Sequence, residues 1–231
     1  MRAQAGMSAL VFPKVVLFDL DGTLLDSAPD MLATVNHMRA ARGHGPMALE
    51  ALRPHVSKGS RAMSAAAFPE LGGEVPPEMI REFLDVYAQV LGRHSVLFEG
   101  VPALLDAIEA AGSRWGIVTN KPEYLARQVL PGLGWEDRCA ILIGGDTLPQ
   151  RKPHPLPLLH AVAELGVGIG DCAYVGDDQR DIDAARAAGM PSVVALWGYR
   201  LPGDDPQAWG ADALAEAVHD LLQPTLWSAL R

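Results

Sequence analysis

The sequence predicts an α/β fold in which a parallel sheet is covered by helices on both faces and an all-helical domain is inserted. Residues 15–18 form an apolar run that is followed by acidic residues and a glycine, the pattern expected where a buried strand ends and the chain turns. Residues 27–95 show only helical spacing of apolar residues, whereas strand-like and helical segments alternate after them. These observations indicate a core of residues 1–26 and 96–231 and an inserted helical domain of residues 27–95.

The first predicted strand leads into two aspartates, Asp19 and Asp21, which are followed by Gly22 and Thr23. In an extended segment, residues two positions apart point the same way, so both carboxylates face one cavity. Two carboxylates this close do not both stay ionised at low cost unless a cation lies between them or one is protonated. The pair therefore indicates a metal site or an acid/base pair, although isolated pairs of this kind also occur at solvated strand ends.

The inserted segment begins at Ser27, a predicted helix N-cap, and contains two long helices and two shorter ones. The long helices are indicated by apolar residues at helical spacing. These residues are Met31, Leu32, Val35 and Met38 in the first helix and Ile80, Phe83, Leu84, Tyr87, Val90 and Leu91 in the second. The shorter helices are expected over residues 51–56 and 62–68, with Gly59 between them.

The rest of the core alternates predicted strands and helices. The strands are expected over residues 115–119, 140–143, 172–176 and 192–195, and apolar spacing predicts helices over residues 101–108, 158–165 and 214–221. A further helix is expected to begin at Pro122. In open parallel sheets, ligands bind beyond the carboxyl ends of the strands. The polar motifs of this chain fall at those ends.

Three polar motifs follow predicted strands or extended segments. Thr119 and Asn120 come at the end of one strand, Lys152 precedes a proline that keeps the backbone extended, and Asp177 and Asp178 follow another strand. Each has an ordinary interpretation on its own: a helix cap, a surface lysine or a solvated acidic turn. Their occurrence together, in this order, after the first aspartate pair indicates a single active site.

With these motifs the chain resembles the haloacid dehalogenase superfamily of phosphotransferases, from Val15 to about residue 200. The resemblance implies a Rossmann-like sheet and a helical cap inserted between the first and second motifs. It also implies that Asp19 is the nucleophile that attacks phosphorus, and that Asp21 is the general acid and base. Phosphoryl transfer requires mainly alignment and charge stabilisation from the protein, which suits this set of residues.

The resemblance further implies that Thr119 and the backbone at Asn120 bind phosphate oxygens and that Lys152 neutralises charge on the phosphoryl group. It implies a Mg²⁺ site held by Asp19, Asp177, Asp178 and the backbone carbonyl of Asp21. Mg²⁺ suits this role because it prefers oxygen ligands and binds through one or two carboxylates and a substrate phosphate. A soft-metal site is not expected, because Cys139 and Cys172 are distant and have no CxxC spacing.

Substrate choice is expected to come from the inserted domain, where Lys58, Gly59 and Arg61 form a basic, glycine-containing loop. Arg61 can bind a substrate carboxylate, while a solvated helix start is the alternative interpretation. Residues 59–63 and the tail around Trp197-Gly198-Tyr199 most resemble the branch that hydrolyses N-acetylmuramic acid 6-phosphate in cell-wall recycling. The alternative is 2-phosphoglycolate hydrolysis, followed by a sugar phosphate mutase or a non-catalytic phosphate-binding module.

Composition agrees with a compact enzyme that acts on a small-molecule phosphate ester. The chain has 231 residues, 49% of them hydrophobic, and its net charge of -9 argues against nucleic-acid binding. No apolar run reaches the ~18 residues of a membrane-spanning helix. The first twelve residues do not fit a signal peptide, and Met7 is an alternative start. The family resemblance implies a cytoplasmic location, and we expect a monomer or weak homodimer that binds neither nucleic acid nor membrane.

Overall fold

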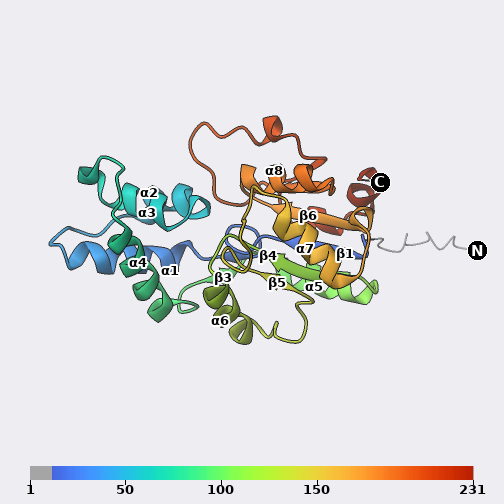
Figure 1. Ribbon diagram of the computed structural model, residues 1–231, viewed down its shortest axis with the longest axis horizontal. Coiled ribbons are helices and arrows are strands. Elements are labelled where there is room, and N and C mark those ends of the chain that lie inside the picture. Colours follow the sequence, from blue (N-terminus) through green and yellow to red (C-terminus); the bar gives the residue numbers. More distant parts are fainter. Residues whose placement is uncertain (1–11, 231) are drawn as a thin grey trace, which may run out of the picture.

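The computed structural model describes residues 12–230, so the alternative start at Met7 lies outside the described residues. It contains a six-stranded parallel sheet with helices on both faces and a separate group of helices beyond one edge (Figure 1). The sheet order is β5-β4-β1-β6-β7-β8. The strands are β1 Val15–Phe18, β4 Arg114–Val118, β5 Leu142–Ile143, β6 Cys172–Gly176, β7 Ser192–Ala195 and β8 Ala213–Ala215. The predicted α/β fold with a helical insertion is confirmed.

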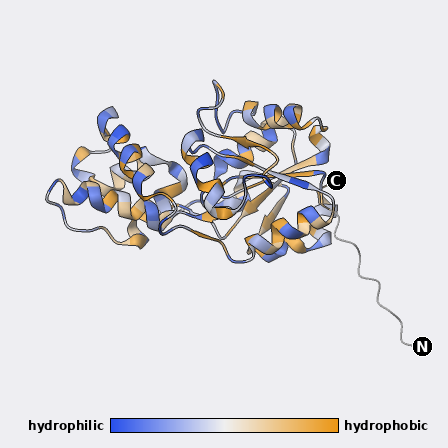
Figure 2. Ribbon diagram, turned by 90° about the horizontal axis from the view of Figure 1, so that it is seen from below, coloured by the Kyte–Doolittle hydropathy of each residue, from blue (hydrophilic) through white to orange (hydrophobic). Residues whose placement is uncertain are grey.

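Strand β1 lies at the centre of the sheet, where it pairs with β4 on one side and β6 on the other. All four of its residues are buried, as expected for an apolar strand covered on both faces. Val16 and Phe18 face the core under one layer of helices, and Val15 and Leu17 face the core under the other layer. Figure 2 shows hydrophobic residues along the strands, with hydrophilic and hydrophobic residues alternating along the helices.

The helices cover the two faces of the sheet in two layers, each packed against one of these two sets of strand side chains. The helices α5 Val101–Ala110, α6 Glu123–Leu133 and α9 Pro224–Ala229 pack on one face. The helices α7 Leu156–Leu165 and α8 Gln179–Ala188 pack on the other face. Two short 3₁₀ segments, Ile169–Asp171 and Pro206–Trp209, connect the core elements. Within residues 12–230, no helix is long and apolar enough to span a membrane.

The remaining helices form a group that we call the helical unit. It consists of α1 Ala28–Ala40, α2 Leu49–Leu52, α3 Ser60–Ala67 and α4 Pro77–Val90, with 3₁₀ segments at Arg53–Lys58 and Pro69–Leu71. These helices bury their own apolar cluster, in which Met38, Phe68 and Phe83 are enclosed. Two short antiparallel strands, β2 Leu25–Asp26 and β3 Val96–Leu97, connect the helical unit to the sheet. The helical unit lies beyond one end of the sheet (Figure 1).

Three local predictions differ from the structure. The short helix predicted over residues 51–56 is divided into α2 Leu49–Leu52 and the 3₁₀ segment Arg53–Lys58. Ser27 does precede α1, but its side chain makes no capping hydrogen bond. The helix predicted over residues 214–221 is wrong: β8 pairs with β7 there, and a 3₁₀ segment follows at Val218–Leu222. Ala215, Val218 and Leu221 are buried in one cluster, while Leu214 is 40% exposed. A short strand followed by a 3₁₀ turn therefore satisfies the same apolar spacing as a helix.

Candidate active site

The site lies where three neighbouring strands end. Asp19 follows β1, Thr119 follows β4, and Asp177 follows β6. These strands are adjacent and parallel, so their carboxyl ends meet at one edge of the sheet. The fold therefore brings the first residues of three sequence motifs together, although up to 158 positions separate them in the chain.

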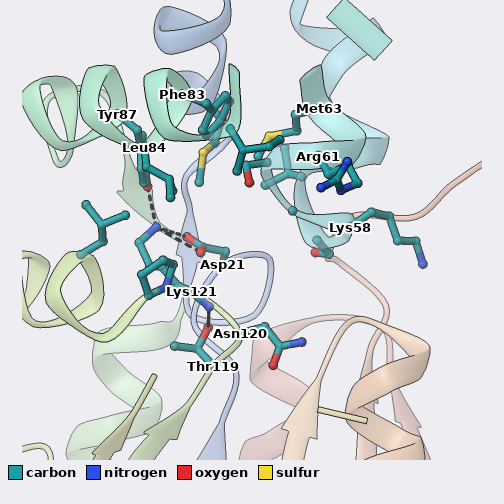
Figure 3. A pocket seen from close by; sticks show the side chains of 18 of the residues that line it. Asp21, Lys58, Arg61, Met63, Phe83, Leu84, Tyr87, Thr119, Asn120 and Lys121 are labelled. Atoms are coloured by element: carbon teal, nitrogen blue, oxygen red, sulfur yellow. Dashed lines mark hydrogen bonds and ion pairs between the residues drawn. The ribbon is translucent and has the colours of Figure 1, made fainter. Parts of the chain in front are cut away.

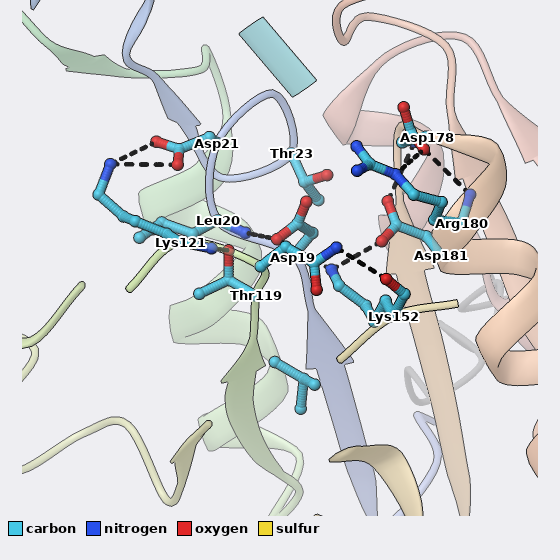
Figure 4. Close-up of polar contacts among 12 residues, drawn as sticks. Asp19, Leu20, Asp21, Thr23, Thr119, Lys121, Lys152, Asp178, Arg180 and Asp181 are labelled. Atoms are coloured by element: carbon cyan, nitrogen blue, oxygen red, sulfur yellow. Dashed lines mark hydrogen bonds and ion pairs between the residues drawn. The ribbon is translucent and has the colours of Figure 1, made fainter. Parts of the chain in front are cut away.

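Asp19 lies beside the buried ammonium of Lys152 (Figure 4). The backbone amide of Leu20 donates a 2.8 Å hydrogen bond to Oδ1 of Asp19, and Nζ of Lys152 lies 3.1 Å from the same oxygen. The Lys152 ammonium also lies 2.7 Å from Asp181 and donates a 2.7 Å hydrogen bond to the hydroxyl of Tyr174. Burial alone lowers the pKa of Lys152, but the charges of Asp181 and Asp19 outweigh this effect and raise it. Lys152 is therefore a cation beside the Asp19 carboxylate.

Three buried carboxylates form a cluster at the same edge. Asp19, Asp177 and Asp181 each contribute an oxygen, and these atoms lie within 4.8 Å of one another. Burial, together with the charges of Asp19 and Asp181, raises the pKa of Asp177 well above its usual range. Burial raises the pKa of Asp181 to about 6, although the charge of Lys152 opposes the shift. The cluster is short of positive charge: among residues 12–230, Lys152 is the only cation that forms ion pairs with it, and these reach Asp19 and Asp181 but not Asp177.

Asp177 is held from three sides. The hydroxyl of Thr23 donates to its Oδ1 over 3.2 Å, and the backbone amide of Tyr199 donates to its Oδ2 over 2.8 Å. The hydroxyl of Ser57, which belongs to the helical unit, donates to the same Oδ2 over 2.7 Å. The guanidinium of Arg180 in α8 donates to the backbone carbonyl of Ser57. The 3₁₀ segment Arg53–Lys58 of the helical unit thus contacts both the acidic cluster and α8.

The donor set fits a divalent cation that prefers oxygen. Three carboxylates removed from water repel one another, and a cation between them would offset that repulsion. An all-oxygen set suits Mg²⁺, Ca²⁺ or Mn²⁺ rather than Zn²⁺. The surrounding backbone also comes unusually close: a Cβ at Gly22, where φ is +89°, or at Gly198 would lie 2.2 Å from Asp177 atoms. Only residues without a side chain leave Asp177 in this position.

Asp178, a predicted metal ligand, does not join this cluster. Its Oδ1 accepts a 3.0 Å hydrogen bond from the backbone amide of Arg180, so it caps α8. Nε of Arg180 lies 2.8 Å from Oδ1, and Nζ of Lys58 lies 2.8 Å from Oδ2. Asp181 stands in the cluster instead, and its Oδ2 accepts from the backbone amide of Asp178. The acidic residue three positions after a helix cap was the signal in the sequence that could have drawn attention to Asp181.

The residues predicted to bind phosphate, Thr119 and Asn120, follow the end of β4 and lie beside the loop that carries Lys152. Thr119 is buried and its Oγ1 accepts a 3.2 Å hydrogen bond from the backbone amide of Lys121. The side-chain Nδ2 of Asn120 donates a 2.9 Å hydrogen bond to the backbone carbonyl of Lys152, which joins the two loops. The side chain of Asp21 points toward Lys121 and not into the acidic cluster (Figures 3 and 4). Lys121, the residue after Asn120, was not predicted as a site residue.

A cavity of about 280 Å³ lies between this edge of the sheet and the helical unit (Figure 3). Asp19, Asp21, Thr119 and Lys121 line it from the core. The helical unit contributes the predicted Lys58, Gly59 and Arg61 together with an apolar wall of Met31, Val56, Met63, Ile80, Phe83, Leu84 and Tyr87. The guanidinium of Arg61 donates a 2.9 Å hydrogen bond to the backbone carbonyl of Val75. The cavity therefore connects the predicted nucleophile to the predicted specificity loop.

Comparison with known proteins places the chain in one family of hydrolases. Residues 16–195 match the model of the haloacid dehalogenase-like hydrolases. The chain is 61% identical over 216 residues to a phosphoglycolate phosphatase of Xanthomonas campestris. The matched region covers 94% of this chain and 98% of the relative. It is 42% identical over 210 residues to the N-acetylmuramic acid 6-phosphate phosphatase of Pseudomonas aeruginosa, with 90% and 93% covered.

A crystal structure from Haemophilus somnus, described as a predicted phosphoglycolate phosphatase, superimposes with a TM-score of 0.80 at 27% identity. The match covers 95% of this chain and 100% of that one. The likeness therefore includes both the sheet and the helical unit.

Proposed function

Because this chain belongs to the haloacid dehalogenase-like hydrolase family and is a phosphatase, we propose that its substrate is 2-phosphoglycolate. The observation that carries this proposal is the 61% identity, over almost the whole of both chains, to a phosphoglycolate phosphatase. The sequence motifs favoured N-acetylmuramic acid 6-phosphate, but the relative with that activity is only 42% identical. The order of the two candidates is therefore reversed.

In the first step, a carboxylate oxygen of Asp19 attacks phosphorus while the bond from phosphorus to the ester oxygen breaks. Asp21 gives its proton to the departing oxygen, which leaves as glycolate. Lys152, whose Nζ lies 3.1 Å from Asp19, offsets the negative charge of the phosphoryl group and of the nucleophile. Thr119 and the backbone at Asn120 are proposed to bind the other phosphoryl oxygens.

In the second step, water attacks the phosphorus of the phosphoaspartyl group, and the bond to Asp19 breaks. Asp21, now a carboxylate, takes a proton from that water. Inorganic phosphate is released, Asp19 returns as a carboxylate, and Asp21 has regained the proton that it gave away. The two steps together consume one ester and one water and form one alcohol and one phosphate.

We propose that Asp19, Asp177 and Asp181, with the backbone carbonyl of Asp21, hold a Mg²⁺ ion. Asp181 replaces Asp178 in this assignment, because Asp181 contributes to the buried cluster while Asp178 caps α8 and pairs with Lys58. When bound, the ion would offset charge on the phosphoryl group and the carboxylates.

We also propose that residues 27–95 act as a cap domain that covers the cavity, with the core formed by residues 1–26 and 96–231. Lys58, Gly59 and Arg61 line the cavity from this side, which supports the proposal that they recognise the substrate carboxylate. The contact of Ser57 with Asp177 supports a closed position of the cap in this structure. Closure of this kind excludes water from the reacting groups.

One observation favours the second candidate, N-acetylmuramic acid 6-phosphate. The cavity of about 280 Å³ and its apolar wall exceed the requirements of a two-carbon ester with only polar groups. An amino sugar with an acetyl group and a lactyl ether would contact Met63, Phe83 and Leu84. This substrate also carries a carboxylate, so recognition by Arg61 does not distinguish the two candidates.

The test is phosphate release in the presence of Mg²⁺ from the two esters measured in parallel, with Asp19→Asn as the inactive control. We expect kcat/KM for 2-phosphoglycolate to exceed that for N-acetylmuramic acid 6-phosphate by about a hundredfold, which corresponds to about 2.7 kcal/mol of transition-state discrimination. The opposite preference would assign the second candidate. Full turnover by Asp19→Asn would overturn the proposed nucleophile.

A further inference from the structure

Lys121 is a buried lysine that lines the cavity but has no role in the reaction proposed above. Its Nζ donates hydrogen bonds to both carboxylate oxygens of Asp21, each over 3.1 Å, and a third to the hydroxyl of Tyr87 over 2.6 Å (Figure 3). The Lys121 side chain is only 2% exposed. The three contacts use the three N–H bonds of the ammonium group. In this arrangement Lys121 has no donor left for a substrate.

The orientation of the Asp21 carboxyl depends on this contact. Asp21 lies in the turn after β1, and its side chain is 13% exposed at the cavity. Among residues 12–230, Lys121 is the only residue that donates a hydrogen bond to this carboxylate. A bidentate contact fixes both the position and the plane of a carboxylate, whereas a free side chain would rotate.

Lys121 is itself fixed at both ends. Its backbone amide donates to Thr119 Oγ1, and its backbone carbonyl accepts a 2.8 Å hydrogen bond from the amide of Gly145. Tyr87 belongs to α4 of the helical unit and is 1% exposed. Burial, reinforced by the charges of Asp21 and Asp30, raises the pKa of Tyr87 well above its usual range. Tyr87 is therefore a neutral phenol whose oxygen accepts from the ammonium.

We propose that Lys121 is a positioning residue that holds the carboxyl of Asp21 toward the ester oxygen of the substrate, and that Tyr87 completes this arrangement from the helical unit. The inference rests on the proposed function, since it takes Asp21 as the group that protonates the departing oxygen. Lys121 forms no bond in the reaction and gives up no proton. Its effect is on the geometry of the proton transfer from Asp21.

The dependence on the leaving group tests this proposal. Proton transfer matters most when the departing oxygen is a strong base, and least when it is stable as an anion. The probes are phenyl phosphate and p-nitrophenyl phosphate, which have nearly the same shape and differ mainly in the basicity of the departing oxygen. The measured quantity is kcat/KM with Mg²⁺, which covers the steps up to departure of the alcohol and excludes the later attack by water.

We expect Lys121→Met to lose about a hundredfold on phenyl phosphate and less than about fivefold on p-nitrophenyl phosphate, the pattern also expected of Asp21→Asn. Lys121→Arg should recover part of the loss on phenyl phosphate, because it keeps a cationic donor. Tyr87→Phe should show the same pattern with a smaller loss. The matched control is Lys14→Met, which removes a lysine whose 3.1 Å ion pair with Asp171 is exposed.

The proposal would be overturned if Lys121→Met and Tyr87→Phe each lost as much activity on p-nitrophenyl phosphate as on phenyl phosphate. It would also be overturned if both variants were as active as the unaltered protein on both esters. The mild Tyr87→Phe change keeps the test valid if Lys121→Met does not fold, which thermal unfolding would reveal. If Asp21→Asn itself shows no dependence on the leaving group, the proposed role of Asp21 fails instead. Because both probes are artificial esters, the result does not depend on which natural ester is the substrate.

Discussion

Nζ of Lys152 lies 2.7 Å from Oδ1 of Asp181, and both side chains are 2% exposed. The lysine comes from the loop before α7 and the aspartate from the first turn of α8. The ion pair therefore joins the loop before α7 to α8 at the edge of the sheet. Breaking a buried pair by removing one partner is costly, because the other charge remains buried without compensation.

Lys152→Met should destabilise the protein strongly in the absence of divalent cations. Methionine has a similar length but no charge, so Asp19 and Asp181 lose the cation between them. We expect the free energy of unfolding to fall by about 3–5 kcal/mol, measured by urea denaturation in a chelating buffer. Lys14→Met removes a lysine that is 69% exposed and should change it by less than about 1 kcal/mol. Equal effects of the two substitutions would contradict the compensating role of Lys152.

Mg²⁺ should stabilise the folded protein, and Asp177→Asn should remove most of this effect. A ligand that binds only the folded state adds about 2.7 kcal/mol when its concentration is a hundred times Kd. Without Mg²⁺, Asp177→Asn should be close in stability to the unaltered protein, because the loss of a repelling charge offsets the loss of one hydrogen-bond acceptor. Thermal unfolding with and without Mg²⁺ measures both effects. Asp183→Asn, on α8 outside the cluster, should keep the full Mg²⁺ response, and its loss there would argue against a site at Asp177.

Gly198→Ala should displace Asp177 and reduce turnover by more than about tenfold, because the distance between its Cβ and the Cβ of Asp177 would be only 2.2 Å. The Mg²⁺ concentration for half-maximal activity should rise with it. The control is Gly132→Ala in α6, where the new Cβ would have no atom within 4 Å apart from its chain neighbours and the backbone of its own helix. That change should leave turnover unaltered and stabilise the helix by up to about 1 kcal/mol. Unchanged metal dependence in Gly198→Ala would show that the cluster tolerates displacement.

The two cysteines should react slowly with a thiol-specific disulfide reagent at pH 8. Burial raises the pKa of both the Cys139 and Cys172 thiols to about 11. A raised pKa keeps the thiol protonated, so only about one part in a thousand is the reactive thiolate at pH 8. Reaction should quicken as the pH rises toward 11, and both thiols should react rapidly at pH 8 in denaturant. Rapid modification of the folded protein at pH 8 would contradict the burial of these groups.

The sequence was most informative where one structural requirement dominated. The apolar run at β1 predicted a buried strand because a central parallel strand has no solvent-facing side. The ends of parallel strands meet at one edge, so motifs at Asp19, Thr119 and Asp177 were expected to converge, and they do. The comparisons confirm the predicted family and fold class, while the roles assigned to individual side chains stay predictions.

Other contacts could not be predicted, because they depend on how separate elements pack. Whether Asp178 or Asp181 lies in the acidic cluster is decided by the helix that begins at Gln179, which turns one carboxylate to cap the helix and the other toward Lys152. The contact of Tyr87 with Lys121 needs α4 to lie against the loop after β4, and no local pattern specifies that distance.

In the proposed site, Ser57 would give the metal and the substrate a shared partner. Its hydroxyl donates to Asp177, while the adjoining Lys58 and Gly59 line the cavity. A cation that takes up the Asp177 oxygen competes with this hydrogen bond, and a substrate that contacts the loop alters it from the other side. In the proposed site, the two binding equilibria would therefore be linked through one short segment. Linkage is reciprocal, so the factor by which the cation changes substrate affinity equals the factor by which substrate changes cation affinity.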